Sequence, residues 1–163
     1  MTTIYTIPAA TRIGHVHLKV ADLTRAVNFY CGLLGFQITT KHGEDAVFIS
    51  AGGYHHHIGL NTWFSKDAPQ ATQAGVGLFH TAIVYALRQD LATIFERLSD
   101  ANYPLTGASD HGVSEALYLD DPDGHGVELY WDRPEELWPR HGDGSVHMYT
   151  RRLDLDDLLR SLL

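Results

Sequence analysis

Two histidines, His15 and His80, occupy equivalent places in two copies of one sequence pattern. Each histidine precedes three apolar or aromatic positions by offsets of 3, 15 and 18 residues. The positions after His15 are Leu18, Tyr30 and Leu33, and those after His80 are Ile83, Phe95 and Leu98. A lone histidine in a strand is more often a core residue than a metal ligand, but matched offsets indicate an internal duplication. The duplication makes the two histidines candidates for one shared role.

Glu128 is the third candidate, because it lies among the apolar residues of the segment HGVELYW, just after the turn DPDG at residues 121–124. An ionised carboxylate that is removed from water needs a partner. If the two copies enclose one cleft, His15, His80 and Glu128 can reach a single ion. Two imidazoles and a carboxylate on one side of a metal leave positions open for substrate. This donor set favours non-haem Fe(II); Mn(II) fits as well, and Zn(II), Ni(II) and Co(II) are less favoured.

The elements that must position these residues follow the same order twice. Residues 11–20 alternate as a strand, and Asp22 caps a helix of about three turns that ends at Gly35. Three short apolar segments come next: FQITT, DAVFISAG and HHHIGLNTW. The strand GLFHTAIVYA, a helix over residues 88–101 and the segments YPLTG, SEALYLD and HGVELYWD repeat this order. The sequence therefore predicts one domain over residues 1–163, with module one over about 11–63, module two over about 77–133 and a C-terminal tail over 134–163.

Two further segments have no counterpart in the repeat. The stretch WFSKDAPQATQAGVG between the modules, residues 63–77, is rich in small and polar residues and predicts a linker or a loop over a site, with the loop at about residues 62–76. The tail has leucines at positions 153, 155, 158, 159, 162 and 163. This spacing predicts a short amphipathic helix that packs on the body of the protein or on a second chain.

Composition excludes several classes of function. The apolar fraction of 44% is that of a chain that folds. The net charge of −8 argues against nucleic-acid binding and against an anionic membrane surface. The single cysteine, Cys31, cannot close an internal disulfide, and the first residues lack the pattern of a secretory leader. We expect a cytoplasmic protein.

The segments GHVHLKVADLTRAVNFYCGLLGF, LFHTAIVY and YLDDPDGHGVELYW resemble the vicinal oxygen chelate superfamily, which includes glyoxalases, bleomycin-resistance proteins and extradiol dioxygenases. The resemblance covers about residues 11–133 and is greatest to type I extradiol dioxygenases of the catechol 2,3-dioxygenase kind. It implies an α+β fold in which two βαβββ modules form a mixed, cleft-forming sheet. It also implies that the family's three metal ligands correspond to His15, His80 and Glu128. Many extradiol enzymes have two pairs of modules, whereas this chain has one.

The same resemblance implies roles for four other residues. In many extradiol enzymes a histidine opens a His-Gly-Val-Ser segment, and a tyrosine stands ten residues before the carboxylate ligand. His111 and Tyr118 match these positions. His111 would hydrogen-bond a substrate or product oxygen, and Tyr118 would position the catecholate oxygen. The family's acid-base histidine falls within the run of histidines at 55–57. Spacing to Gly59 favours His56, whereas strand alternation favours His57, so both are retained.

The resemblance implies an Fe(II)-dependent dioxygenase that cleaves a catechol-type ring with O₂, as in the catabolism of aromatic compounds. The expected partners are a small aromatic substrate, O₂ and a second copy of the chain in a homodimer. The same fold also supports chemistry without O₂, by a glyoxalase-like lyase, an isomerase or epimerase, or an antibiotic-modifying transferase. A ligand-binding resistance protein that uses no metal is the remaining alternative.

Overall fold

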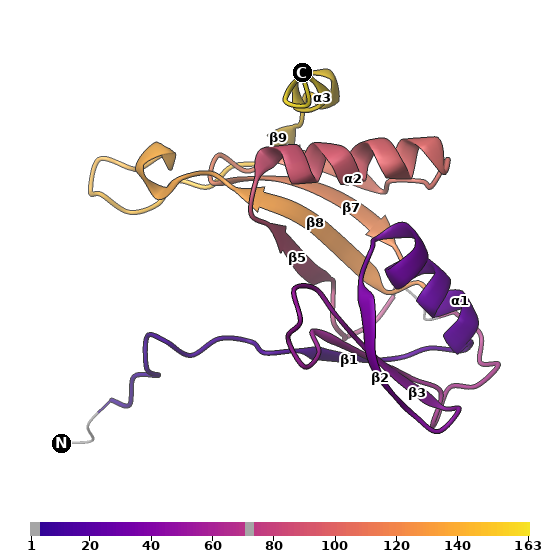
Figure 1. Cartoon of the computed structure of the whole chain (residues 1–163). Coiled ribbons are helices and arrows are strands. Elements are labelled where there is room, and N and C mark those ends of the chain that lie inside the picture. Colours follow the sequence, from indigo (N-terminus) through magenta and orange to yellow (C-terminus); the bar gives the residue numbers. More distant parts are fainter. Residues whose placement is uncertain (1–3, 71–73) are drawn as a thin grey trace.

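The computed structural model describes residues 4–70 and 74–163, and its elements form two modules of the same order (Figure 1). The first module consists of β1 (Val16–Lys19), α1 (Leu23–Val27), η1 (Asn28–Leu33), β2 (Gln37–His42), β3 (Ala46–Ser50) and β4 (Ile58–Asn61). The second consists of β5 (Thr81–Tyr85), α2 (Arg88–Asp100), β6 (Gly107–Asp110), β7 (Ser114–Asp120) and β8 (Gly126–Asp132). The tail adds η2 (Glu135–Leu137), β9 (Arg151–Arg152) and α3 (Leu155–Arg160). The repeated βαβββ order is as the sequence predicted.

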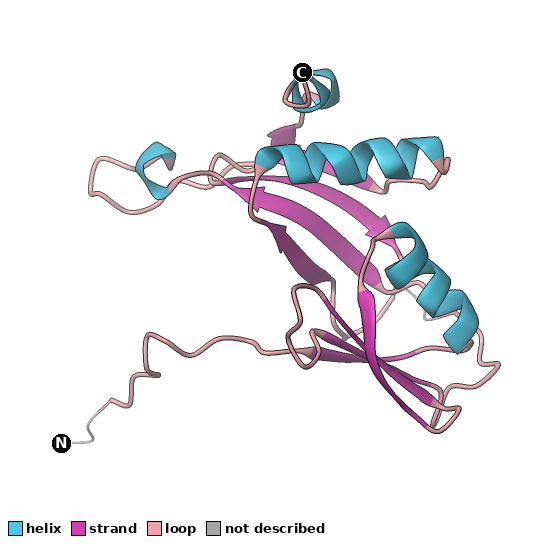
Figure 2. Cartoon of the chain, viewed as in Figure 1, coloured by secondary structure: helices cyan, strands magenta, loops and turns pink. Residues whose placement is uncertain are grey.

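Each module contributes one mixed sheet, and the two sheets are separate (Figure 2). Their strand orders are β1-β4-β3-β2 and β5-β8-β7-β6-β9. In both sheets the first strand runs parallel to the last strand of its own module, and the remaining pairs are antiparallel. The fold is therefore α+β, as predicted, with β1 and β5 each at the edge of a sheet.

Several predicted strands are shorter in the structure. HHHIGLNTW is a strand only over β4 and GLFHTAIVYA only over β5, so the histidines at 55–57 and His80 lie just before these strands. The strand expected over residues 11–20 is confined to β1, because its partner β4 is only four residues long. His15 thus lies just before the strand. The segment YPLTG at residues 103–107 is not a strand, and β6 begins only at Gly107. Pro104 has no N–H to donate to a ladder, which explains this later start.

The first helix begins as predicted, since the Asp22 carboxylate accepts a 3.0 Å hydrogen bond from the Arg25 N–H. It then continues from α1 into the π-helical turn η1, which sequence periodicity did not reveal. Gly35 follows with a φ of 89°, a conformation that favours glycine at a helix end. Within the described residues, no helix has the length and apolarity needed to cross a bilayer.

The helices of the two modules contact each other over a common core. Arg97 of α2 donates to the carbonyls of Leu33 and Gly32 at the end of η1, at 3.2 and 3.0 Å. A cation is favourable at this end of a helix because the carbonyls carry partial negative charge. One hydrophobic cluster runs through both modules and reaches Leu153 and Leu158 in the tail. The tail helix therefore packs on the body, which was one of the two placements predicted from its leucines.

A buried carboxylate in the turn before β8 joins the modules. The Asp121 side chain has no exposed surface and accepts hydrogen bonds from Tyr30 of the first module and from His125, both at 2.9 Å. In the same turn, Asp123 accepts from the Arg25 side chain at 2.6 Å and from the Ala21 N–H at 3.1 Å. We call this set of bonds the Asp121 clasp. It fixes the first module against the turn that leads into β8.

The clasp is sensitive to pH through His125. Its hydrogen bond to Asp121 raises the pKa of His125 although burial opposes the rise. Burial alone would raise the pKa of Asp121, but the bond and charge of His125 lower it. A raised histidine pKa means that the stabilisation is complete below about pH 6.5 and is lost as the pH rises through the folded-state value. Because the pKa of Asp121 is lowered, the contribution of this carboxylate to the free energy of unfolding is present above about pH 3.8 and is lost in acid.

We therefore expect the free energy of unfolding of the native chain to be lower when measured at about pH 8.5 than at about pH 6, and part of this difference to be absent in His125→Gln. The variant should lose about 0.5–1 kcal/mol at pH 6, since His125 is partly exposed to solvent. Urea titrations at both pH values measure this difference. His42→Gln, an exposed position on β2, is the matched control. Equal pH dependence in His125→Gln and the native chain would contradict the role of the clasp.

Candidate functional site

His80 and Glu128 form a close pair on the second sheet. β5 and β8 are parallel neighbours, and Ala82 lies opposite Glu128 in their register. His80, two residues before Ala82, directly precedes β5. From there it reaches the carboxylate, with 3.0 Å between His80 Nε2 and Glu128 Oε2. Both side chains are largely but not fully buried. The pair is thus accessible to a small ligand.

A glycine permits this approach. A Cβ on Gly126 would collide with the carbonyl oxygen of Phe79 and would lie 3.2 Å from the Cβ of His80. Backbone and histidine therefore occupy the space that a side chain would need at the start of β8. Gly126 keeps His80 in reach of Glu128.

Tyr118 and His111 extend the pair into a chain of hydrogen bonds. Tyr118 on β7 lies directly opposite Glu128 on β8, and its hydroxyl donates to Glu128 Oε1 at 2.8 Å. The other neighbour of the hydroxyl is His111 Nε2, also at 2.8 Å. Burial, followed by the bond to Glu128, raises the pKa of Tyr118 well above its ordinary value. The phenol therefore keeps its proton at neutral pH.

The other predicted histidines gather on the first module. The rings of His15 and His56 have centroids 4.4 Å apart, and Nδ1 of His56 lies 2.8 Å from Nδ1 of His55. Burial and then the neighbouring His15 lower the pKa of His56. His57 points differently, because its Nδ1 accepts from the Ala51 N–H at 3.3 Å and lies 3.0 Å from Ser50 Oγ. The choice between His56 and His57 stays open.

The first module has no counterpart of the carboxylate. The register pairs His17 with Gly59 just as it pairs Ala82 with Glu128. A Cβ on Gly59 would lie only 2.8 Å from the His17 ring, so the histidine covers the site at which the repeat carries Glu128. His17 also contacts Trp63, with ring centroids 5.5 Å apart. At this register position the second module carries a carboxylate and the first does not.

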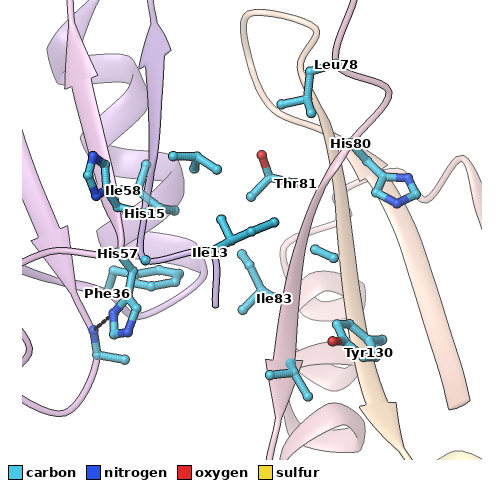
Figure 3. Close-up of a pocket in the computed structure, with 15 residues that line it drawn as sticks. Ile13, His15, Phe36, His57, Ile58, Leu78, His80, Thr81, Ile83 and Tyr130 are labelled. Atoms are coloured by element: carbon cyan, nitrogen blue, oxygen red, sulfur yellow. Dashed lines mark hydrogen bonds between the residues drawn. The ribbon is translucent and has the colours of Figure 1, made fainter. Parts of the chain in front are cut away.

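A cleft of about 610 Å³ lies between the modules, with His15 and His57 on one wall and His80 on the other (Figure 3). Figure 3 shows the rings of His15 and His80 turned away from each other. A second pocket of about 360 Å³ is lined by His80, Tyr118 and His111. The structure thus brings His80, Glu128, Tyr118 and His111 together and leaves His15 and His56 in a separate group.

The pair of His80 and Glu128 fits two positions around a divalent metal. Neighbouring ligands of an octahedral ion at about 2.1 Å lie about 3 Å apart, which is the separation of the two donor atoms. Within residues 4–70 and 74–163, no group of three histidine, cysteine or carboxylate side chains is arranged to hold an ion. The ligand role of His15 therefore stays a prediction that requires this residue to approach the pair.

Sequence reasoning missed one contributor to the site. Thr150 of the tail lines the second pocket, beside His111. No signal in the sequence indicated this position, because the tail lies outside the repeat. The predicted loop over residues 62–76 is described except for residues 71–73.

The structure thus has two βαβββ modules and a histidine–glutamate pair near the start of β8. A profile of the glyoxalase/bleomycin resistance protein/dioxygenase superfamily matches residues 12–129. The chain belongs to this superfamily.

Individual relatives differ in length and name. The chain is 37% identical over 153 residues to a catechol-2,3-dioxygenase of Bacillus subtilis (strain 168). This alignment covers 91% of this chain but 51% of that protein. It is 31% identical over 128 residues to biphenyl-2,3-diol 1,2-dioxygenase 3 of Rhodococcus globerulus, covering 77% of this chain and 67% of the relative. The chain thus spans about half the length of the Bacillus subtilis relative.

A solved structure of lactoylglutathione lyase from Agrobacterium tumefaciens superposes with a TM-score of 0.59 at 20% identity. The superposition covers 76% of this chain and 96% of that one. At this identity the likeness shows the shared fold alone.

We expect Gly126→Ala to lower the free energy of unfolding by about 1–3 kcal/mol, because the added methyl has no room beside β5. The control is Gly107→Ala on β6, where a Cβ would meet the Tyr118 side chain at an ordinary 3.6 Å. Urea denaturation compares the two variants. If Gly126→Ala is no less stable than Gly107→Ala, the packing of His80 against Gly126 does not constrain the pair.

Proposed function

We propose that this chain is a metal-dependent extradiol dioxygenase that cleaves a catechol-type ring with O₂. The observation that carries the proposal is the chain of hydrogen bonds from Glu128 through Tyr118 to His111, beside His80. It joins two metal-ligand types to a phenol and an imidazole that can bind substrate oxygens. The similarity to the Bacillus subtilis and Rhodococcus globerulus dioxygenases supports the same conclusion.

His15, His80 and Glu128 would hold the ion, with Fe(II) as the first candidate and Mn(II) as the second. Zn(II), Ni(II) and Co(II) fit the donor set less well. A bound Fe(II) would supply adjacent open positions that bring a chelating diol and O₂ into contact.

Tyr118 and His111 orient the substrate in this proposal. The Tyr118 hydroxyl lies between Glu128 and His111 and keeps its proton, so it can donate to a substrate oxygen near Glu128. His111 holds the Tyr118 hydroxyl from the opposite side. Donors placed in advance at developing negative charge lower the barrier, because they need no reorganisation.

Removal of a proton from the substrate falls to His56 or His57. The lowered pKa of His56 keeps its imidazole neutral at pH 7, as a proton acceptor must be. His57 carries its proton on Nε2 when neutral, because Nδ1 accepts from Ala51. His56 could take up a hydroxyl proton and return it later, since histidine exchanges protons near neutrality. His57 could do so once its Nδ1 releases the Ala51 N–H.

We also propose that the site is completed in a homodimer. The Asp121 clasp holds the two modules of one chain with His15 and His80 on opposite walls, and the two rings point apart (Figure 3). Movement of His15 to Glu128 within one chain would break a clasp around a buried carboxylate, which costs several kcal/mol. A second copy can present its His15 to the open second sheet without this cost. Two copies would then form two equivalent sites.

O₂ consumption tests the activity. Anaerobically Fe(II)-loaded protein and a panel of catechols should give O₂ uptake matched to a yellow ring-opened product. Glu128→Ala should lose bound iron and at least about 100-fold in rate, because two ligands hold the ion poorly. His141→Ala, an exposed tail histidine, is the matched control and should keep both. Metal-loaded protein that consumes no O₂ with any catechol would overturn the proposal in favour of chemistry without O₂.

Complementation tests the shared site. His15→Ala and Glu128→Ala should each be inactive alone, and light scattering should give twice the 18.2 kDa chain mass. After the two variants are mixed under conditions that allow subunit exchange, about a quarter of the sites should be intact, since half the dimers are mixed and each has one complete site. Verified exchange without recovered iron binding would show that each site lies within one chain.

A further inference from the structure

The C-terminal tail crosses the second sheet beside His111. β9 pairs with the outer edge of β6, with Asp110 opposite Arg151, so Tyr149 and Thr150 arrive next to His111. Beyond β9, Leu153 and Leu158 are buried in the common core, and Arg88 of α2 binds the Asp157 side chain at 2.7 Å. The tail is thus fixed along the outer edge of the second sheet.

Tyr149 binds the backbone and the side chain of His111. Its N–H donates to the His111 carbonyl at 3.2 Å, and its own carbonyl lies 3.0 Å from His111 Nδ1. Its ring packs on Gly112, where a φ of 78° favours glycine and an added Cβ would lie 2.6 Å from the ring. Arg151 stacks on the same ring, with its guanidinium carbon 4.3 Å from the centroid. Tyr149 is therefore held by backbone bonds to His111 and by ring contacts with Gly112 and Arg151.

A backbone carbonyl accepts hydrogen bonds and cannot donate them. The 3.0 Å bond to Tyr149 therefore requires a proton on His111 Nδ1, and the Thr150 hydroxyl, 3.3 Å away, can accept from the same N–H. In a neutral ring the other nitrogen, Nε2, is then an acceptor, and it lies 2.8 Å from the Tyr118 hydroxyl. The Tyr149 carbonyl thus determines that Nε2 of His111 faces Tyr118 and that this nitrogen carries no proton when the ring is neutral.

We infer that Tyr149 is a positioning residue that holds neutral His111 in its Nδ1–H tautomer and so presents Nε2 as an acceptor to Tyr118. The consequence for turnover rests on the proposed function. The superfamily profile matches residues 12–129, so Tyr149 lies outside the matched segment. With His111 so held, Glu128 and His111 are alternative acceptors for the single Tyr118 proton, which the hydroxyl donates to Glu128 in the structure.

The test is the tautomer itself, measured by long-range ¹H–¹⁵N NMR of histidine-labelled, metal-free protein at a pH at which histidines are neutral. His111→Gln identifies the His111 signals by their disappearance. The native chain should show His111 with its proton on Nδ1. Tyr149→Ala removes the ring that packs on Gly112 and should give a mixture of both tautomers, whereas Met148→Ala, an exposed neighbour in the tail, should leave His111 unchanged. Native His111 protonated on Nε2 would overturn the inference, even if Tyr149→Ala fails to fold.

Kinetics on the iron-loaded protein then separate this inference from the proposed function. Tyr149→Ala should lower kcat by about tenfold with little change in KM, since a proton acceptor is misplaced while the substrate pocket remains. An Nδ1–H tautomer in a protein that consumes no O₂ would refute the proposed function alone. An Nε2–H tautomer in an active dioxygenase, or a folded Tyr149→Ala that keeps the native tautomer, would refute the inference alone.

Discussion

The buried carboxylate of Asp121 is the interaction on which the arrangement of both modules depends. A charge with no exposure to solvent is tolerated only where donors surround it, and here the donors come from both modules: Tyr30 from η1 and His125 from the turn itself. Without the first module, the carboxylate would lose the Tyr30 donor. The same turn opens β8, so the residue that joins the modules also sets the start of the strand that carries Glu128.

The two βαβββ units place residues at equivalent registers but carry different side chains there. His17 opposite Gly59 corresponds to Ala82 opposite Glu128. In the second copy the small alanine leaves room beside the carboxylate, whereas in the first copy the glycine leaves room for an imidazole. The second module therefore offers the pair of His80 and Glu128, and the first offers histidines at the equivalent positions. A centre that adds His15 to this pair must draw on both modules.

The sequence predicted the parts of this arrangement that follow from periodicity and failed where angles between elements matter. The offsets from His15 and His80 predicted the duplication, and the structure has the βαβββ order twice. The spacing of ten residues from Tyr118 to Glu128 also corresponds to a direct cross-strand pair. By contrast, no periodicity states the angle between two sheets, and so the opposite walls occupied by His15 and His80 could not be anticipated. The contact between Tyr149 and His111 was equally invisible, because it joins a repeat to a tail with no repeat.

These failures share a physical cause and point to where specificity resides. Elements inside a module are placed by local hydrogen bonds and by register, which a sequence pattern encodes directly. The cleft, the second pocket and the tail contact are instead placed by side chains that meet across modules, such as the Asp121 clasp and the packing of Tyr149 on Gly112. Proteins of this fold can therefore keep the histidine–glutamate pair while their tails differ in how they contact residues such as His111 beside it. In this chain Tyr149 of the tail contacts His111, and His111 in turn contacts the Tyr118 hydroxyl that donates to Glu128.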